Sequence, residues 1–331
     1  MNYFIVDTLP HRIVFLFYWA DFLFFSFPVI MITSQKKAMN LRTVLRGTGV
    51  AIVTPFDVNE SVDFDSLGKV IDFVISNGVE YIVSQGTTGE TPTLDNHEKL
   101  DILEYTFEKI NGRVPVVVGI GGNNTKEVCN TLQKFPLGKA TAVLSAAPYY
   151  NKPSQEGIFQ HYKALAGASP KPIILYNVPG RTGRNMETTT TLRLANEVAN
   201  IAGIKEAANS IPQCMQLLKD RPDDFLIVSG DDDLVLPELA AGIDGVISVA
   251  ANCFPKQFSS MVRAGLSGDF SAANKLNNPL IEAYNLLFAE NNPAGVKAFL
   301  FEQGLIKNKL RLPLVPVSAA LQQKIKLYLQ S

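Results

Sequence analysis

Lys205 is the residue whose surroundings best suit it to covalent chemistry. It ends the apolar run Ile201–Ile204, where a strand would bury its side chain, and lysines are seldom fully buried unless they are paired. Loss of hydration lowers the pKa of an amine, and a neutral amine attacks a ketone to form an iminium. The alternative is a structural ion pair with an acid such as Glu206, although adjacent residues of a strand face opposite sides. Lys205 is therefore the candidate nucleophile.

Two further segments carry groups that bind carboxylates or transfer protons. In Gly86–Glu90, Thr87 and Thr88 lie between two glycines. Such a loop has free N–H groups for a carboxylate or a phosphate, although the same pattern is typical of a plain strand-to-helix turn. Arg181 offers a planar guanidinium to a carboxylate, and Tyr176 offers a phenol that can relay protons. Without these neighbours, Arg181 could equally be a solvated loop residue.

Two other segments are less decisive. Tyr149 and Tyr150 follow an apolar run, where they could pack or catalyse, and spacing does not decide. Gly230 precedes three aspartates, Asp231–Asp233, which favour a helix N-terminal cap over a Mg²⁺ site. The histidines and cysteines lack metal-ligand spacing, so we expect no metal and no cofactor.

The composition is that of a globular chain without a polyanion-binding surface. Hydrophobic residues make up 47% of the sequence and charged residues 18%, with a formal net charge of −1 at pH 7. This balance provides no electrostatic footprint for nucleic acid. Three widely separated cysteines fit free thiols in a reducing compartment, so we expect a cytoplasmic protein.

The first 38 residues differ from the rest of the chain. Residues 13–33 are rich in phenylalanine and are interrupted by Asp21 and Pro28, and their length is close to the roughly 20 residues of a bilayer span. The favoured interpretation is that Met39 is the true start and that residues 1–38 lie outside the fold. A membrane anchor over residues 13–33, or a cytosolic extension, are the alternatives.

Eight short apolar runs alternate with stretches of helical spacing over the remaining sequence. The runs are Val50–Val53, Tyr81–Ser84, Val116–Gly119, Ala142–Ser145, Ile173–Tyr176, Ala202–Lys205, Leu226–Ser229 and Gly245–Val249. Apolar runs of this length are typical of parallel strands buried on both faces. Eight units favour a (β/α)₈ barrel over an open doubly wound sheet, which would need a G-x-G-x-x-G motif after an early strand. We expect the barrel over residues 39–254 and a C-terminal helical region packed with it over residues 255–331.

The barrel would bring the candidate groups together. Lys205 ends the sixth run, Tyr176 ends the fifth, and Thr87 follows the second. Active sites of such barrels lie at the C-terminal ends of the strands. These side chains should therefore face one cavity.

Four motifs resemble, in order, those of the dihydrodipicolinate synthase/N-acetylneuraminate lyase family. They are GTTGE at Gly86–Glu90, PYYNKPSQEG at Pro148–Gly157, YNVPGRTG at Tyr176–Gly183 and GIKEA at Gly203–Ala207. The resemblance extends from Gly47 to Leu327. It implies a pyruvate-dependent Schiff-base lyase.

The resemblance implies a role for each pyruvate-binding residue. Lys205 would form the Schiff base with pyruvate. Thr87 and Thr88 would hold the pyruvate carboxylate, helped by backbone groups near Ile247, and Gly230 would also bind substrate. The site implied by the resemblance needs no cofactor.

The resemblance also implies a proton relay and a second substrate. Tyr176, Thr87 and Tyr150 would form the relay, with Tyr150 crossing into a neighbouring subunit of a homodimer or homotetramer. Arg181 would bind the second carboxylate, which favours L-aspartate-4-semialdehyde over a polyhydroxylated sugar. The implied product is 4-hydroxy-tetrahydrodipicolinate, an intermediate of lysine and diaminopimelate synthesis.

The nearest alternative is a pyruvate-releasing aldolase of the same family, acting on a 2-keto-3-deoxy sugar acid or on 4-hydroxy-2-oxoglutarate. It would share Lys205, so Arg181 and the aldehyde preference distinguish the two reactions. A phosphosugar enzyme, whose phosphate the Gly86–Glu90 loop could bind, would leave the lysine unexplained. A non-catalytic sensing barrel would need neither the lysine nor Tyr176.

Regulation by lysine is a separate question. Asn123, Glu127 and Tyr149 occupy the positions where the family's regulatory site would lie. The segment Leu94–Lys99, however, departs from the pattern of lysine-inhibited members. We therefore expect lysine inhibition to be weak or absent.

Overall fold

The structure, a computed structural model, describes residues 5–8, 11–14 and 40–331. The chain divides into two compact units, Met1–Met39 and Asn40–Ser331. In the first unit, β1 (Ile5–Thr8) pairs antiparallel with β2 (His11–Val14). The expectations about a start at Met39 and about an anchor over residues 13–33 fall largely outside the described residues. None of the helices in the described ranges has the length and apolar character needed to cross a bilayer.

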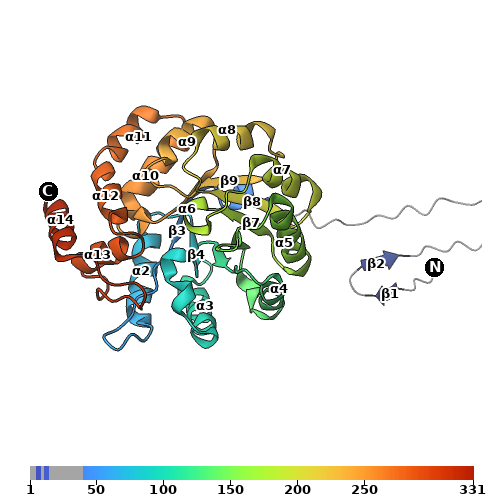
Figure 1. Cartoon of the computed structure of the whole chain (residues 1–331), viewed down its shortest axis with the longest axis horizontal. Helices are drawn as coiled ribbons and strands as arrows, with labels where there is room; N and C mark the ends of the chain where they lie inside the picture. The colour runs from blue at the N-terminus through green and yellow to red at the C-terminus, as the bar shows by residue number, and fades with distance from the viewer. Residues whose placement is uncertain (1–4, 9–10, 15–39) are drawn as a thin grey trace, which may run out of the picture. The chain divides into compact units, whose positions relative to one another are not determined.

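Eight parallel strands of the second unit close into a barrel (Figure 1). They are β3 (Gly47–Ala51), β4 (Tyr81–Ser84), β5 (Val116–Gly119), β6 (Ala142–Ala146), β7 (Ile173–Asn177), β8 (Ile201–Glu206), β9 (Leu226–Ser229) and β10 (Gly245–Ser248). Each strand pairs with its sequence neighbours, and β10 pairs with β3 to close the ring. The predicted (β/α)₈ fold is confirmed.

The first barrel strand begins earlier than the sequence predicts. We expected Val50–Val53, whereas β3 spans Gly47–Ala51. Its first half is rich in glycine because a neighbour fills the space where side chains would lie: a Cβ at Gly49 would come within 2.1 Å of Cε2 of Tyr81. A prediction based on apolar side chains therefore places the start of this strand after its true first residue.

Amphipathic helices surround the strands. They are α2 (Phe64–Ser76), α3 (Asn96–Ile110), α4 (Thr125–Lys134), α5 (Gln155–Ala168), α7 (Thr188–Glu197), α8 (Ile211–Asp220) and α9 (Val235–Ala241). Helix α3 begins at a capping box, in which Asp95 and Glu98 each accept a hydrogen bond from the other's backbone N–H. Leu41 of α1 (Leu41–Val44) and the following Leu45 pack with the residues inside the barrel. They close the end at which β3 begins, so the opposite end of the barrel is the open one.

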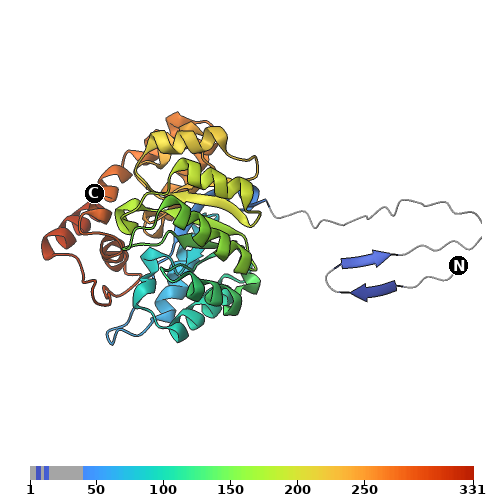
Figure 2. The same ribbon diagram turned by 45° about the vertical axis from the view of Figure 1, so that its right-hand side comes forward.

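The chain beyond the last strand is helical. It forms α10 (Pro255–Leu266), α11 (Phe270–Asn277), α12 (Leu280–Phe288), α13 (Ala294–Glu302) and α14 (Ala319–Gln330). Helix α10 contacts β3 and β10 and is thus the outer helix of the last βα unit. The helices α11–α14, orange to red in Figures 1 and 2, lie along one side of the barrel. The predicted helical extension is confirmed, whereas the division at residue 254 stays a prediction.

A buried histidine is expected to make the stability of this fold sensitive to acid. His161 of α5 is almost fully buried, with its Nδ1 2.8 Å from Oγ1 of Thr125. Burial lowers the pKa of His161 to about 4, whereas an unfolded histidine titrates near 6.5. Between these pH values the unfolded chain binds the extra proton, so the free energy of unfolding falls as the pH drops. From pH 7 to pH 5 we expect a loss of about 2 kcal/mol from this group.

Urea unfolding at both pH values, on the wild type and on His161→Gln, measures this loss. The variant has no group that titrates at this position, so its stability should fall less over the same interval. Equal losses in the two proteins would assign the acid sensitivity to other groups.

Candidate active site

A cavity of about 510 Å³ lies at the C-terminal ends of the barrel strands. Seven of the residues that the sequence singled out line it: Thr87, Thr88, Tyr149, Tyr176, Arg181, Lys205 and Gly230. They lie at the C-terminal ends of the strands β4, β6, β7, β8 and β9 or in the loops that follow those ends. The barrel thus brings together groups that are more than one hundred residues apart in the chain.

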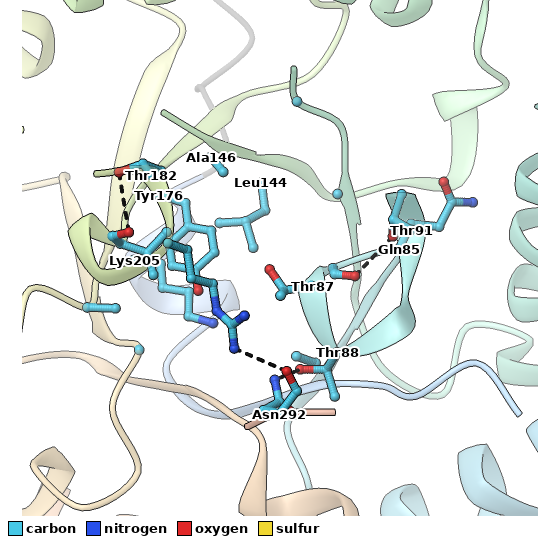
Figure 3. A pocket seen from close by; sticks show the side chains of 18 of the residues that line it. Gln85, Thr87, Thr88, Thr91, Leu144, Ala146, Tyr176, Thr182, Lys205 and Asn292 are labelled. Carbon is cyan, nitrogen blue, oxygen red and sulfur yellow. Dashed lines mark hydrogen bonds between the residues drawn. The ribbon is translucent and has the colours of Figure 1, made fainter. Parts of the chain in front are cut away.

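Lys205 lies in this cavity near the end of β8. Its side chain is buried, with a residue exposure of 5%, and its Nζ lies 4.5 Å from the centre of the Tyr176 ring on the paired strand β7. Figure 3 shows the two side chains together, with Thr87 facing them across the cavity. A Cβ at Gly230 would come within 2.8 Å of the Lys205 Cε, so glycine at that position leaves room for the lysine.

Glu206 does not serve as the partner of Lys205. It points to the opposite face of β8, where its carboxylate accepts hydrogen bonds from Asn177 Nδ2 at 2.9 Å and Gln213 Nε2 at 3.0 Å. Burial raises the pKa of Glu206 to about 7. The alternative interpretation of Lys205 as half of an ion pair with this acid is therefore wrong.

The hydroxyl groups come from a tight turn after β4. Thr87–Gly89 form a 3₁₀ turn, η1. The hydroxyl of Thr54 donates to the Gly89 carbonyl at 2.7 Å, which fixes the far side of the turn. Thr88 is buried and Thr87 is half-buried at the cavity wall. The loop therefore offers two hydroxyl groups on the side of the cavity opposite the lysine.

Arg181 lies at the mouth of the cavity on the short helix α6 (Pro179–Thr182). Its Nη2 donates to the carbonyl of Asn292 at 3.2 Å, and Asn292 Nδ2 donates to Thr88 Oγ1 at 3.0 Å. Asn292 thus links the guanidinium to the threonine loop (Figure 3). The side-chain oxygen of Asn292 is buried and has no hydrogen-bond partner among the described residues, and the residue lines the cavity.

Sequence reasoning missed Asn292. It lies between α12 and α13 in the helical extension, far from any strand end, and reaches the cavity only because that extension packs beside the barrel. The dipeptide Asn292-Pro293 marks a turn, but nothing local indicates what the asparagine contacts.

The aspartates after β9 do not act as predicted. Helix α9 begins at Val235 without a side-chain cap, so the expected helix N-terminal cap is wrong. Asp232 instead accepts hydrogen bonds from the backbone N–H groups of Val249 at 3.1 Å and Ala250 at 2.8 Å, on the loop after β10. Asp231 lines the cavity, and burial raises its pKa to about 6. Because β9 pairs with β10, the loop after β10 lies within hydrogen-bonding distance of Asp232. The residues next to Asp232 in the sequence do not indicate this contact.

Other predicted site residues lie outside the cavity. Ile247 is fully buried inside the barrel, and Val249, two residues further on, lines the cavity instead. Tyr150 is 89% exposed in this single chain and has a left-handed backbone with φ of 66°. Its side chain is therefore free to meet another molecule.

The three candidate regulatory residues are exposed, and one of them, Tyr149, also lines the cavity. Asn123 and Tyr149 are joined by two hydrogen bonds, from Asn123 Nδ2 to the Tyr149 carbonyl at 2.7 Å and from the Tyr149 N–H to Asn123 Oδ1 at 2.8 Å. Glu127 is exposed on α4. The Asn123 side chain is thus committed to holding the Tyr149 backbone.

A closed parallel barrel with a buried lysine at the C-terminal ends of its strands, two threonine hydroxyl groups opposite and an arginine at the rim is the arrangement of a class I Schiff-base lyase. The chain belongs to the dihydrodipicolinate synthetase family, whose family model matches residues 44–331.

Individual relatives agree with this assignment. The chain is 49% identical over 282 residues to the 4-hydroxy-tetrahydrodipicolinate synthase of Parabacteroides distasonis, covering 85% of this chain and 95% of that relative. The chloride-inhibited dihydrodipicolinate synthase of Acinetobacter baumannii, solved with pyruvate, matches with a TM-score of 0.84 and 40% identity over 86% of this chain and 98% of that one. The enzyme of Cyanidioschyzon merolae with lysine bound matches with a TM-score of 0.83 and 32% identity, over 87% and 98% of the two chains.

Proposed function

We propose that this chain condenses pyruvate with L-aspartate-4-semialdehyde through a Schiff base on Lys205, giving 4-hydroxy-tetrahydrodipicolinate for lysine and diaminopimelate synthesis. The observation that carries the proposal is the buried amine of Lys205 facing two hydroxyl groups across a cavity whose mouth holds Arg181. A relative named for this reaction matches 85% of this chain.

Lys205 and Tyr176 perform the covalent steps. The amine of Lys205 adds to C2 of pyruvate, and loss of water leaves an iminium. The iminium withdraws electrons from C3, which loses a proton to become an enamine. The enamine carbon bonds to the aldehyde carbon of the second substrate, whose oxygen takes up a proton. The substrate amine then attacks C2 and displaces Lys205 as the ring closes, with Tyr176 as the adjacent proton carrier.

The remaining polar groups bind the carboxylates of the two substrates at different places in the cavity. Thr87 and Thr88 offer hydroxyl groups to the pyruvate carboxylate, and Gly230 leaves space beside the lysine. Arg181 binds the carboxylate of the second substrate as a planar fork. The buried Oδ1 of Asn292, which has no partner in the described part of the chain, suits the amino group of an amino-acid aldehyde, because a buried acceptor gains most from a charged donor. This pairing favours the semialdehyde over a sugar acid.

We propose that Tyr150 completes the proton relay in a neighbouring subunit. Its exposed side chain beside the half-exposed Tyr149 fits a contact between copies of the chain in a homodimer or homotetramer. We also propose that the enzyme is cytoplasmic, because its three cysteines are free thiols. Contact with a membrane depends on whether residues 13–33 form an anchor.

Borohydride trapping followed by substrate assays tests the reaction. Incubation with pyruvate and borohydride should add one pyruvate-sized mass to the protein, mapping to Lys205. Pyruvate with L-aspartate-4-semialdehyde should then give product, whereas 2-keto-3-deoxy sugar acids and 4-hydroxy-2-oxoglutarate should release little pyruvate. Faster cleavage of those acids than condensation would favour the aldolase, and no adduct on folded protein would refute the Schiff-base class.

Lysine should be a weak inhibitor. The hydrogen-bonding groups of Asn123 are occupied by the backbone of Tyr149, so binding lysine there would require breaking contacts that hold the loop. We expect little change in the initial rate of condensation as lysine is added up to millimolar concentration. Half-inhibition by sub-millimolar lysine would contradict this prediction.

A further inference from the structure

A fully buried ion pair lies behind the threonine loop and outside the cavity. Glu90, the last residue of the GTTGE motif, pairs with the Nζ of Lys297 on α13, and neither side chain is exposed to solvent. Neither residue is among those that line the cavity. The pair therefore does not touch substrate in the reaction proposed above.

Glu90 controls the shape of the turn that carries the hydroxyl groups. It adopts a left-handed backbone, with φ of 52° and ψ of 32°, between the 3₁₀ turns η1 and η2 (Thr91–Thr93). Its N–H donates to the carbonyl of Thr87 at 3.1 Å. A glutamate in this conformation is held there by its surroundings, because the left-handed region is unfavourable for side chains other than glycine, asparagine and aspartate.

The groups that hold Glu90 come from the C-terminal helical extension. Besides Lys297, the backbone N–H of Arg311 donates to Glu90 Oε2 at 3.1 Å. The ammonium of Lys297 donates to the carbonyl of Lys309 at 2.9 Å and lies 4.2 Å from the centre of the Phe56 ring. Each of the two buried charges thus has at least two partners, as a charge removed from water requires.

Arg311 makes a second set of contacts with the loop between β4 and α3, through its side chain. Its guanidinium donates to Glu98 Oε2 at 2.7 Å and to the carbonyl of Thr93 at 3.0 Å, and it lies over the Phe56 ring. Glu98 belongs to the capping box of α3. The segment from Lys297 to Arg311 therefore holds the loop between β4 and α3 at both ends of η2.

We propose that the Glu90–Lys297 ion pair is a positioning device that sets the affinity for the keto-acid carboxylate by fixing the turn that presents Thr87 and Thr88. Removing the charges leaves the nucleophile untouched but lets the turn relax. Small displacements of a binding group cost large factors in binding and rate. This inference rests on the proposed function, because it names pyruvate as the ligand of the turn.

The test compares variants that keep the charge balanced. Removing Lys297 alone would leave a buried, unpaired carboxylate and could unfold the chain, so the principal variant is the double substitution Glu90→Gln with Lys297→Met. We expect its circular dichroism to match that of the wild type and its half-saturating pyruvate concentration, from borohydride trapping and from initial rates, to rise about tenfold. The turnover number at saturating pyruvate should change less than about threefold, because Lys205 and Tyr176 remain in place.

The matched control is Lys307→Met. Lys307 lies in the same segment and pairs with Asp63 at 3.8 Å on the surface, where ion pairs contribute little. Its half-saturation should equal that of the wild type. If the double variant does not fold, Glu90→Gln alone is the second variant: its amide oxygen can still accept a hydrogen bond from Lys297 Nζ, which also keeps the Lys309 carbonyl. It should raise the half-saturating concentration about threefold.

The outcomes separate this inference from the proposed function. A folded variant with wild-type half-saturation overturns the inference while leaving the reaction intact. A lower turnover number with unchanged half-saturation also overturns it, because the pair would then act on the chemistry. Absence of a pyruvate adduct on the wild type refutes the proposed function itself.

Discussion

Replacing Lys205 with alanine is expected to abolish the borohydride-trapped pyruvate adduct and to lower the condensation rate on the order of 10⁴-fold or more. In the proposed mechanism the buried amine of Lys205 forms the iminium; among the described residues a second lysine, the less buried Lys99, also lines the cavity. Intact-mass spectrometry after trapping, followed by peptide mapping, measures the first effect. Initial rates with both substrates measure the second.

Lys205→Arg is the matched control for the loss of charge. Arginine keeps a positive group near the Tyr176 ring but cannot form the Schiff base, because its guanidinium stays protonated. Both variants should therefore be inactive while remaining folded by circular dichroism and thermal unfolding. If Lys205→Ala still formed the full amount of adduct on another lysine, that lysine and not Lys205 would be the nucleophile.

Replacing Arg181 with alanine is expected to lower kcat/KM for the semialdehyde about 10²-fold, equivalent to about 3 kcal/mol, while leaving the pyruvate adduct intact. The guanidinium lies at the mouth of the cavity beside Asn292, so its loss removes the group proposed to bind the second carboxylate and leaves Lys205 in place. Steady-state rates with varied semialdehyde measure the effect. Trapping at varied pyruvate, without the aldehyde, shows whether the first half-reaction is spared.

Two further substitutions sharpen this prediction. Arg181→Lys keeps the charge but loses the planar fork, so it should recover only part of the lost kcat/KM. Arg184→Ala removes an exposed arginine of the same segment that donates to the carbonyl of Lys152, and it should change the kinetics little. An equal rise in half-saturating pyruvate for Arg181→Ala would show that Arg181 acts on the first substrate or on the loop.

The sequence alone was sufficient for the barrel and for the main polar groups of the cavity. Parallel strands buried on both faces are continuous apolar runs, so their positions can be read from local composition. Closure of the ring then places every strand's C-terminal end at one rim. For this reason Lys205, Tyr176 and Thr87, each at or just after a strand end, could be assigned to one site before any contact was known.

Only the tertiary structure reveals the contacts between residues that are far apart in the sequence. Asn292 lies in the helical extension yet donates to Thr88, and Lys297 pairs with Glu90 because α13 packs behind the threonine loop. Asp232 likewise binds the backbone of a neighbouring strand's loop instead of beginning its own helix. These partners are set by how distant elements pack together, and local patterns of hydrophobicity and turn residues carry no record of that packing. The sequence therefore determined which groups could react, and the packing of the helical extension determined how they are held.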